Sequence, residues 1–181
     1  QTGTACAKGG SFGWLNDKTA VFSRSSRGNE EGGRQIEEVL RSQGVELVQI
    51  DLTGYRLHID GLFLMLAPDL ALVNPAQLPF PFLQKLKELG IETVEVHPED
   101  TPWIINGLAV APRRAIMTAG ASHYTLDRLS AKGVEVLTIP YALVCSGGGG
   151  PHCSPSPFTR DPVRGPACST LLSTASSVSS P

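Results

Sequence analysis

The chain has 181 residues, of which 41% are hydrophobic, so it is long enough to form one domain with a substantial apolar core. Its formal net charge of -2 argues against nucleic acid and anionic membrane surfaces as partners. No apolar run approaches the roughly 18 residues of a spanning helix, no signal peptide is apparent, and the first residue is glutamine, so we expect a cytoplasmic protein of which this is a fragment or processed piece.

In chain order, the sequence repeats itself about every 45 residues, a period typical of stacked or radially arranged supersecondary units. A glycine at 44, 90 or 133 marks each unit and is followed by a β-branched residue, a glutamate and an alternating apolar strand. Before each glycine we predict a strand (19–23, 70–74, 114–118) and a helix (30–43, 80–89, 124–132). Two further apolar segments, 62–67 and 108–111, lead onward from the first two units. The pattern predicts an α/β fold built from strand–helix–strand repeats.

Each predicted helix carries apolar residues at i, i+3 and i+4 spacing, which form one stripe. The stripes are Ile36, Val39 and Leu40 in the first helix, Phe82, Leu83, Leu86 and Leu89 in the second, and Leu126 and Leu129 in the third. The marker glycine then ends the helix in the left-handed conformation. We expect the helices outside, with their stripes facing short inner strands.

Polar residues follow the glycine-led strand of each unit: His58 and Asp60 after the first, Asn106 after the second, and a loop with Cys153 after the third. Repeats arranged around an axis bring equivalent positions together. We therefore expect these four side chains to converge on one site.

Four consecutive glycines, 147–150, precede Cys153, and prolines at 151, 155 and 157 stiffen the segment. Glycines stabilise neither helix nor strand, but they let backbone pass close to a neighbour or aim its N–H groups inward. A glycine run can also be a plain linker. The other three cysteines, at 6, 145 and 168, show no C-x-x-C spacing and are too few for a disulfide scaffold, which fits a reducing compartment.

A cysteine attacks as thiolate, and an unperturbed pKa of about 8.5 leaves little of it at neutral pH, so a base is needed. His152 is adjacent to Cys153, but neighbouring side chains of an extended loop point to opposite faces. His58 and Asp60 would share one face of a strand, so His58 could handle protons while Asp60 binds a cation. Two alternatives are a structural role for His58 in the core and a metal site. The metal site would use His58, Asp60, His152 and Cys153, but these ligands come from two remote segments without a recognisable spacing.

Residues 57–63, Leu-His-Ile-Asp-Gly-Leu-Phe, and 148–153, Gly-Gly-Gly-Pro-His-Cys, resemble the guanidino-group modifying enzymes. This superfamily holds dimethylarginine dimethylaminohydrolase, arginine deiminase and the amidinotransferases. The resemblance covers roughly residues 5–162 and implies part of a five-bladed, pseudo-symmetric α/β propeller of ββαβ units. It implies that Cys153 is the nucleophile, His58 the general acid and base, and Asp60 a ligand of the substrate guanidinium. We place Asn106, Gly149 and Gly150 in the same substrate site.

The sequence departs from the family pattern where a Glu-Gly-Gly-Asp motif is expected. Lys8 replaces the glutamate, and Ser11 replaces the aspartate. About two of the five units, those N-terminal to this chain, are also expected to be missing. A lysine about 4 Å from a guanidinium costs about 4 kcal/mol at an effective dielectric constant of 20. We therefore expect weak activity or none, and we expect uncovered strand edges that favour aggregation or a homodimer.

The sequence thus predicts a hydrolase of a small guanidine, such as an N-ω-methylated arginine, that gives citrulline and an amine through a covalent Cys153 thiouronium and needs no metal or other cofactor. The alternatives are a truncated or degenerate non-catalytic relative and an amidinotransferase. Residues 1–162 form the predicted domain, and the Ser-rich stretch 163–181 is interpreted as a disordered or foreign tail.

Overall fold

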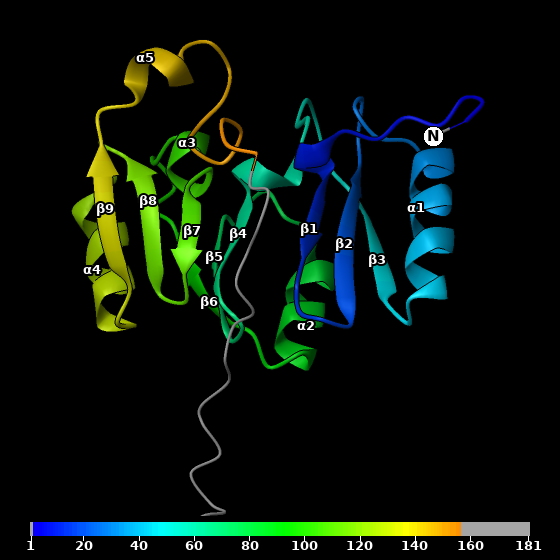
Figure 1. Cartoon of the computed structure of the whole chain (residues 1–181). Helices are drawn as coiled ribbons and strands as arrows, with labels where there is room; N and C mark the ends of the chain where they lie inside the picture. The colour runs from blue at the N-terminus through cyan, green and yellow to red at the C-terminus, as the bar shows by residue number, and fades with distance from the viewer. Residues whose placement is uncertain (1, 157–181) are drawn as a thin grey trace, which may run out of the picture.

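The computed structural model describes residues 2–156, which form three mixed α/β units side by side (Figure 1). Each unit contains a three-stranded sheet. The sheets consist of β1 (Phe12–Trp14), β2 (Thr19–Arg24) and β3 (Glu46–Asp51); β4 (Phe63–Ala67), β5 (Leu70–Val73) and β6 (Glu92–Glu95); and β7 (Leu108–Ala111), β8 (Arg114–Thr118) and β9 (Glu135–Ile139). The predicted tail, the boundary at residue 162 and the last part of the family resemblance lie outside the described residues.

Within each sheet the first two strands form an antiparallel hairpin, and the third strand returns parallel to the second. The parallel return needs a crossover helix, which is α1 (Glu30–Ser42), α2 (Phe80–Glu88) or α4 (His123–Ala131). Two short helices, α3 (Pro102–Ile105) and α5 (Ala142–Cys145), and two 3-10 helices, η1 (Gly9–Ser11) and η2 (Ile59–Gly61), lie in the connections.

The predicted repeat is confirmed, with element bounds within one or two residues of those expected. The marker glycines 44, 90 and 133 follow their helices with φ of 72°, 72° and 70°, the left-handed conformation expected of them. The segments 62–67 and 108–111 belong to the next unit as β4 and β7, which makes each unit ββαβ. Three such units are described, so a five-bladed ring stays a prediction.

One predicted helix stripe is partly wrong. Val39 of α1 is 59% exposed, whereas Gly32, Gly33 and Leu40 are buried. A Cβ on Gly33 would lie 2.3 Å from Oε1 of Gln49, so this glycine lets α1 approach its sheet closely. The helix face that carries the glycines therefore contacts the sheet, and Val39 faces away.

The units interlock because a helix of one unit also packs on the sheet before it. Phe82 of α2 belongs to one apolar cluster with Val21 of the first sheet and Val73 of the second. Leu129 of α4 likewise belongs to one apolar cluster with Val94 of the second sheet and with residues of the third sheet. This packing fixes the three units, and hence the polar residues in their connections, relative to one another. No helix within residues 2–156 is long and apolar enough to cross a membrane.

Candidate active site

His58 and Asp60 belong to a tight turn, which corrects the expectation that they lie on a strand. His58 is the N-cap of η2, and Asp60 lies within it. Both side chains nevertheless face the same neighbour: a Cβ on Gly10 would lie 2.7 Å from Nδ1 of His58 and 2.8 Å from Oδ2 of Asp60. The two residues thus share one side through a turn rather than through the alternation of a strand.

Asn106 joins the η2 turn to the cysteine loop. It follows α3 and is 1% exposed. Its Oδ1 accepts hydrogen bonds from the N–H groups of Gly150 (3.0 Å) and Cys153 (3.3 Å), and its Nδ2 donates to the carbonyl of Asp60 (3.2 Å). Its own carbonyl accepts from the N–H of His152 (3.0 Å). One buried amide therefore holds the loop against η2.

The glycines of the loop allow close backbone contact, one of the two roles expected for them. A Cβ on Gly150 would lie 2.7 Å from Oδ1 of Asn106, and one on Gly149 would lie 3.1 Å from Cβ of Cys153. Gly148 has φ of 98°, which other residues rarely adopt. The chain then turns back, with the N–H of Cys153 donating to the carbonyl of Gly150 at 3.1 Å.

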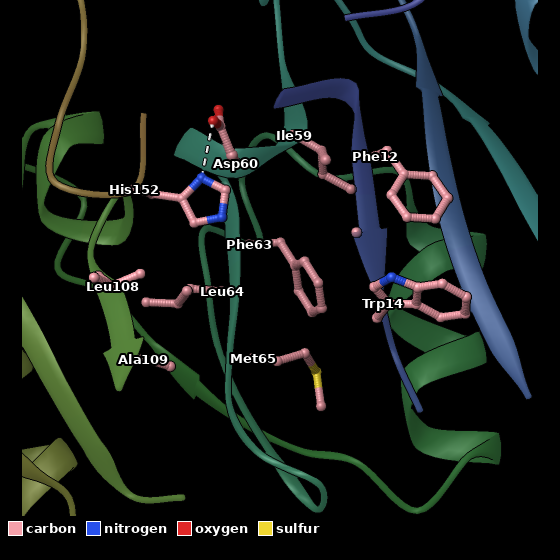
Figure 2. A pocket seen from close by; sticks show the side chains of 11 residues that line it. Phe12, Trp14, Ile59, Asp60, Phe63, Leu64, Met65, Leu108, Ala109 and His152 are labelled. Atoms are coloured by element: carbon pink, nitrogen blue, oxygen red, sulfur yellow. Dashed lines mark hydrogen bonds and ion pairs between the residues drawn. The ribbon is translucent and has the colours of Figure 1, made fainter. Parts of the chain in front are cut away.

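Asp60 is the centre of the site. Its Oδ2 lies 3.3 Å from Nδ1 of His152 and 3.4 Å from Sγ of Cys153, as Figure 2 shows for the histidine. The expectation that His152 and Cys153 point to opposite faces is therefore wrong, because residues 150–153 form a turn instead of an extended strand. The position of His152 directly beside Cys153 in the sequence was the signal that could have predicted this contact.

The environment favours the protonated thiol. Partial burial raises the pKa of Cys153, and the nearby Asp60 carboxylate raises it further, while contacts with Asn106 and the Gly150 backbone act in the opposite direction. The net pKa is raised from its ordinary value. The raised pKa favours the protonated thiol of Cys153 at neutral pH.

Asp60 lines two hollows. The first, about 240 Å³, is lined by His58, Asp60, Asn106 and Cys153, together with Arg56 and Trp103. The second, about 340 Å³, is mainly apolar and lies between the inner strands β1, β4 and β7. Figure 2 shows Phe63 and Met65 extending from β4 toward β1, which carries Trp14, with Asp60 and His152 at one end of this second hollow.

Residues 8–11, where the resemblance expects two acids, reach the site through Gly10, which was not among the predicted site residues. Lys8 is exposed, and Ser11 is fully buried with no hydrogen-bond partner for its Oγ among the described residues. Nε2 of His58 is likewise buried and unbonded within residues 2–156. No group of three or more His, Cys, Asp or Glu side chains in this part of the chain is arranged to hold a metal ion.

Comparison with known proteins relates the chain to enzymes of arginine chemistry. It is 36% identical over 83 residues to an arginine deiminase from Mycobacterium marinum, a match of 45% of this chain and 20% of the relative. An arginine deiminase from Rhodococcus erythropolis is 37% identical over 76 residues, 42% of this chain and 18% of that one. No protein-family model matches.

Three solved structures share the fold at a TM-score of 0.68 and 20% identity. They are an amidinotransferase from Microseira wollei in the saxitoxin pathway (80% of this chain, 45% of that one), dimethylarginine dimethylaminohydrolase from Pseudomonas aeruginosa in complex with citrulline (82% and 55%), and the N-terminal domain of a cyanobacterial arginine dihydrolase (80% and 53%). The chain spans about half the length of these structures and about a fifth of the curated relatives. The resemblance predicted from the motifs is confirmed at the level of fold.

Proposed function

Because the chain has the fold of the guanidino-group modifying enzymes, we propose that it is a cysteine-dependent hydrolase of a small guanidine such as an N-ω-methylated arginine. The observation that carries this proposal is the grouping of Asp60, His58 and Cys153 around one hollow, with the Asp60 carboxylate 3.4 Å from the thiol. A carboxylate recognises a guanidinium, a thiolate attacks its carbon, and an imidazole moves the protons that both steps require.

The first half of the reaction forms a covalent intermediate. The guanidinium binds Asp60 and offsets the negative charge that raises the pKa of Cys153, so the thiol loses its proton to His58. The thiolate then attacks the guanidinium carbon. His58 returns the proton to the departing amine as the carbon–nitrogen bond breaks, which leaves a thiouronium on Cys153.

The second half restores the enzyme. A water molecule gives one proton to His58 and adds to the thiouronium carbon. The carbon–sulfur bond breaks, the departing thiolate takes the proton back from His58, and the product loses its extra proton to solvent and carries a neutral ureido group, as in citrulline. In this scheme the cysteine loop is shaped by Asn106, Gly149 and Gly150. The oxygen and the nitrogen of the Asn106 amide both hydrogen-bond to protein groups, so Asn106 positions the loop. No metal or organic cofactor takes part.

One observation favours a second candidate, a non-catalytic relative with the same fold. Lys8 and Ser11 stand where the resemblance expects carboxylates, so Asp60 is the remaining acid at this hollow among the described residues. An amidinotransferase would share the covalent step but pass the amidino group to an amine instead of water.

The test measures citrulline release from dimethylarginine and from arginine, with Cys153→Ser as the blank, alongside intact mass after treatment with chloroacetamidine. Hydrolysis predicts citrulline and a Cys153 adduct. An adduct without citrulline supports a binding protein, unless an added amine accepts the amidino group. Absence of both contradicts the proposal.

A further inference from the structure

The second hollow, between the inner strands β1, β4 and β7, is not used by the proposed reaction. Its volume of about 340 Å³ lies within the range of pockets that bind small ligands, which are mostly apolar with a few placed polar groups. The lining has this composition. Among the described residues that line the hollow, only Asp60 and His152 carry titratable side chains, and the others are apolar or glycine.

His152 and Asp60 form a hydrogen-bonded pair at one end of this hollow (Figure 2). A carboxylate only accepts hydrogen bonds, so the 3.3 Å contact places a proton on Nδ1 of His152. Nε2 of the neutral imidazole is then an acceptor, and it has no hydrogen-bond partner within residues 2–156. The pair therefore offers one free acceptor nitrogen, backed by the negative charge of Asp60.

The acceptor nitrogen belongs to a ring that borders the apolar part of the hollow. Figure 2 shows the imidazole of His152 between the Asp60 carboxylate and the side chains of Phe63 and Leu64. A hydrogen-bond donor bound there would be largely shielded from water. A charge-assisted hydrogen bond is stronger than a neutral one, and more so where water is excluded.

The rest of the lining favours an aromatic group. Phe12 and Trp14 of β1 form an edge-to-face pair with ring centroids 5.5 Å apart, and Phe63 and Met65 extend toward them from β4. Aromatic rings and methionine sulfur pack well against a further ring. Trp14 is 49% exposed, so the described residues leave its ring partly uncovered, and a bound aromatic group would bury it.

We propose that the second hollow binds an aromatic amine, with the ring of the ligand among Trp14, Phe63 and Met65 and its ammonium group donating to Nε2 of His152. The positive charge of the ammonium group offsets the Asp60 carboxylate. An aromatic acid would instead bring a second anion toward that carboxylate, which is unfavourable. The chain thus has a ligand site apart from the hollow of Cys153, although Asp60 lines both.

The experiment measures the affinity of the protein for three ligands of similar size by isothermal titration calorimetry: 2-phenylethylamine, 2-phenylethanol and phenylacetate. The amine should bind about tenfold more tightly than the alcohol, because its hydrogen bond is charge-assisted, and phenylacetate should bind most weakly. Equal affinities for amine and alcohol, tighter binding of phenylacetate, or no binding of the amine would each overturn the inference.

Tryptophan fluorescence locates the ligand, because the two tryptophans of the chain line different hollows, Trp14 the second and Trp103 the first. In Trp103→Phe the remaining Trp14 should respond to 2-phenylethylamine with the affinity measured by calorimetry. In Trp14→Phe the remaining Trp103 should not respond. A response from Trp103 alone would place the amine in the hollow of Cys153 and would refute the proposal.

Filling the second hollow should remove the site. Ala109→Phe should weaken amine binding about tenfold or more, because the added ring occupies the volume of the ligand. The matched control is Ala111→Phe, on the same strand at an exposed position that lines neither hollow, and it should bind as wild type does. Unchanged amine binding in a folded Ala109→Phe protein contradicts the inference.

The acceptor is tested separately, so the inference stays falsifiable even if Ala109→Phe unfolds. His152→Phe should abolish the preference for amine over alcohol, and His123→Phe, at an exposed position away from both hollows, should keep it. A preference retained in His152→Phe is evidence against the site. Cys153→Ser should bind the amine as wild type does, so a failure of the proposed reaction at Cys153 would leave this result standing.

Discussion

At the scale of single residues, we expect the Asp60 carboxylate to have two opposing effects on the site. Its carboxylate would attract a guanidinium, yet it also raises the pKa of the thiol it contacts. In the proposed mechanism, the same contact keeps the resting thiol protonated until a guanidinium binds Asp60. Changes at Asp60 should therefore affect binding and nucleophilicity in opposite directions.

Asp60→Asn should lower the pKa of Cys153, because it removes the negative charge that opposes thiolate formation. At neutral pH more thiolate should be present, so the uncharged reagent iodoacetamide should react faster than with wild type, by a few-fold to about tenfold. Cationic chloroacetamidine should react more slowly, since its anionic partner is gone. The measurement is the pH dependence of both alkylation rates.

Asp51→Asn is the matched control, because Asp51 pairs with Arg24 away from both hollows. It should leave both rates unchanged. An Asp60→Asn protein with the wild-type thiol pKa would show that the carboxylate does not govern Cys153.

Lys8→Glu should strengthen guanidine binding, because it replaces a positive charge near the site with a negative one. Lys8 lies two positions before Gly10, which contacts both His58 and Asp60. Since Lys8 is exposed, water and salt screen the effect, and we expect about a fivefold gain that shrinks as ionic strength rises. Citrulline release and chloroacetamidine labelling, each at low and high salt, measure it. A gain that is independent of salt would contradict this electrostatic explanation.

At the scale of elements, the cysteine loop depends on one buried amide. Asn106→Ala removes the acceptor of two loop N–H groups and one donor to η2. Buried donors left without a partner cost about 1–3 kcal/mol, so the free energy of unfolding should fall by that amount. Urea denaturation measures this loss of stability. Asn16→Ala, which removes a single local hydrogen bond to Lys18, should cost less than 1 kcal/mol, roughly.

The helix-ending glycines provide a second test at this scale. Gly90 has φ of 72°, with open space around a would-be Cβ. Gly90→Ala should therefore destabilise through backbone conformation alone, by about 1–2 kcal/mol in urea denaturation. Gly9→Ala, which is equally uncrowded but has no positive φ, is the control and should be close to neutral. Equal effects at both positions would mean that the left-handed conformation is not the cause.

At the scale of the whole molecule, no helix among the described residues covers one face of the third sheet. The helices α2 and α4 cover the first and second sheets, and each boundary has an ion pair, Lys85 with Glu46 and Lys132 with Glu92. On the third sheet the equivalent face carries a row in register, Leu108, Ile116 and Leu137. Leu137 is 58% exposed, so this face is apolar and uncovered by the described residues.

A face of this kind should promote self-association, which is the homodimer anticipated from uncovered edges. Leu137→Glu should weaken any concentration-dependent association about tenfold or more, because a charge would have to be buried in the contact. Sedimentation velocity over a range of concentrations measures it. Leu143→Glu, at a 91% exposed position on α5, is the control. A chain that is monomeric at all concentrations would contradict the prediction.

The sequence alone determined the repeat and the element order, and it singled out residues that lie around one hollow. It could do so because helix stripes, strand alternation and helix-ending glycines act over a few neighbouring residues. The marker glycines at 44, 90 and 133 adopt the predicted conformation for this local reason. Convergence of His58, Asp60, Asn106 and Cys153 followed from the repeat, since equivalent positions meet when units stack.

Only the tertiary structure decided how these residues contact one another. The turn at 150–153 brings His152 and Cys153 to the same oxygen of Asp60, which local alternation could not reveal. Close packing at Gly33 turned Val39 outward, and the approach of Gly10 to Asp60 joined segments remote in sequence. These features depend on distances between units, and such distances are set by the shapes of side chains from several strands and helices at once.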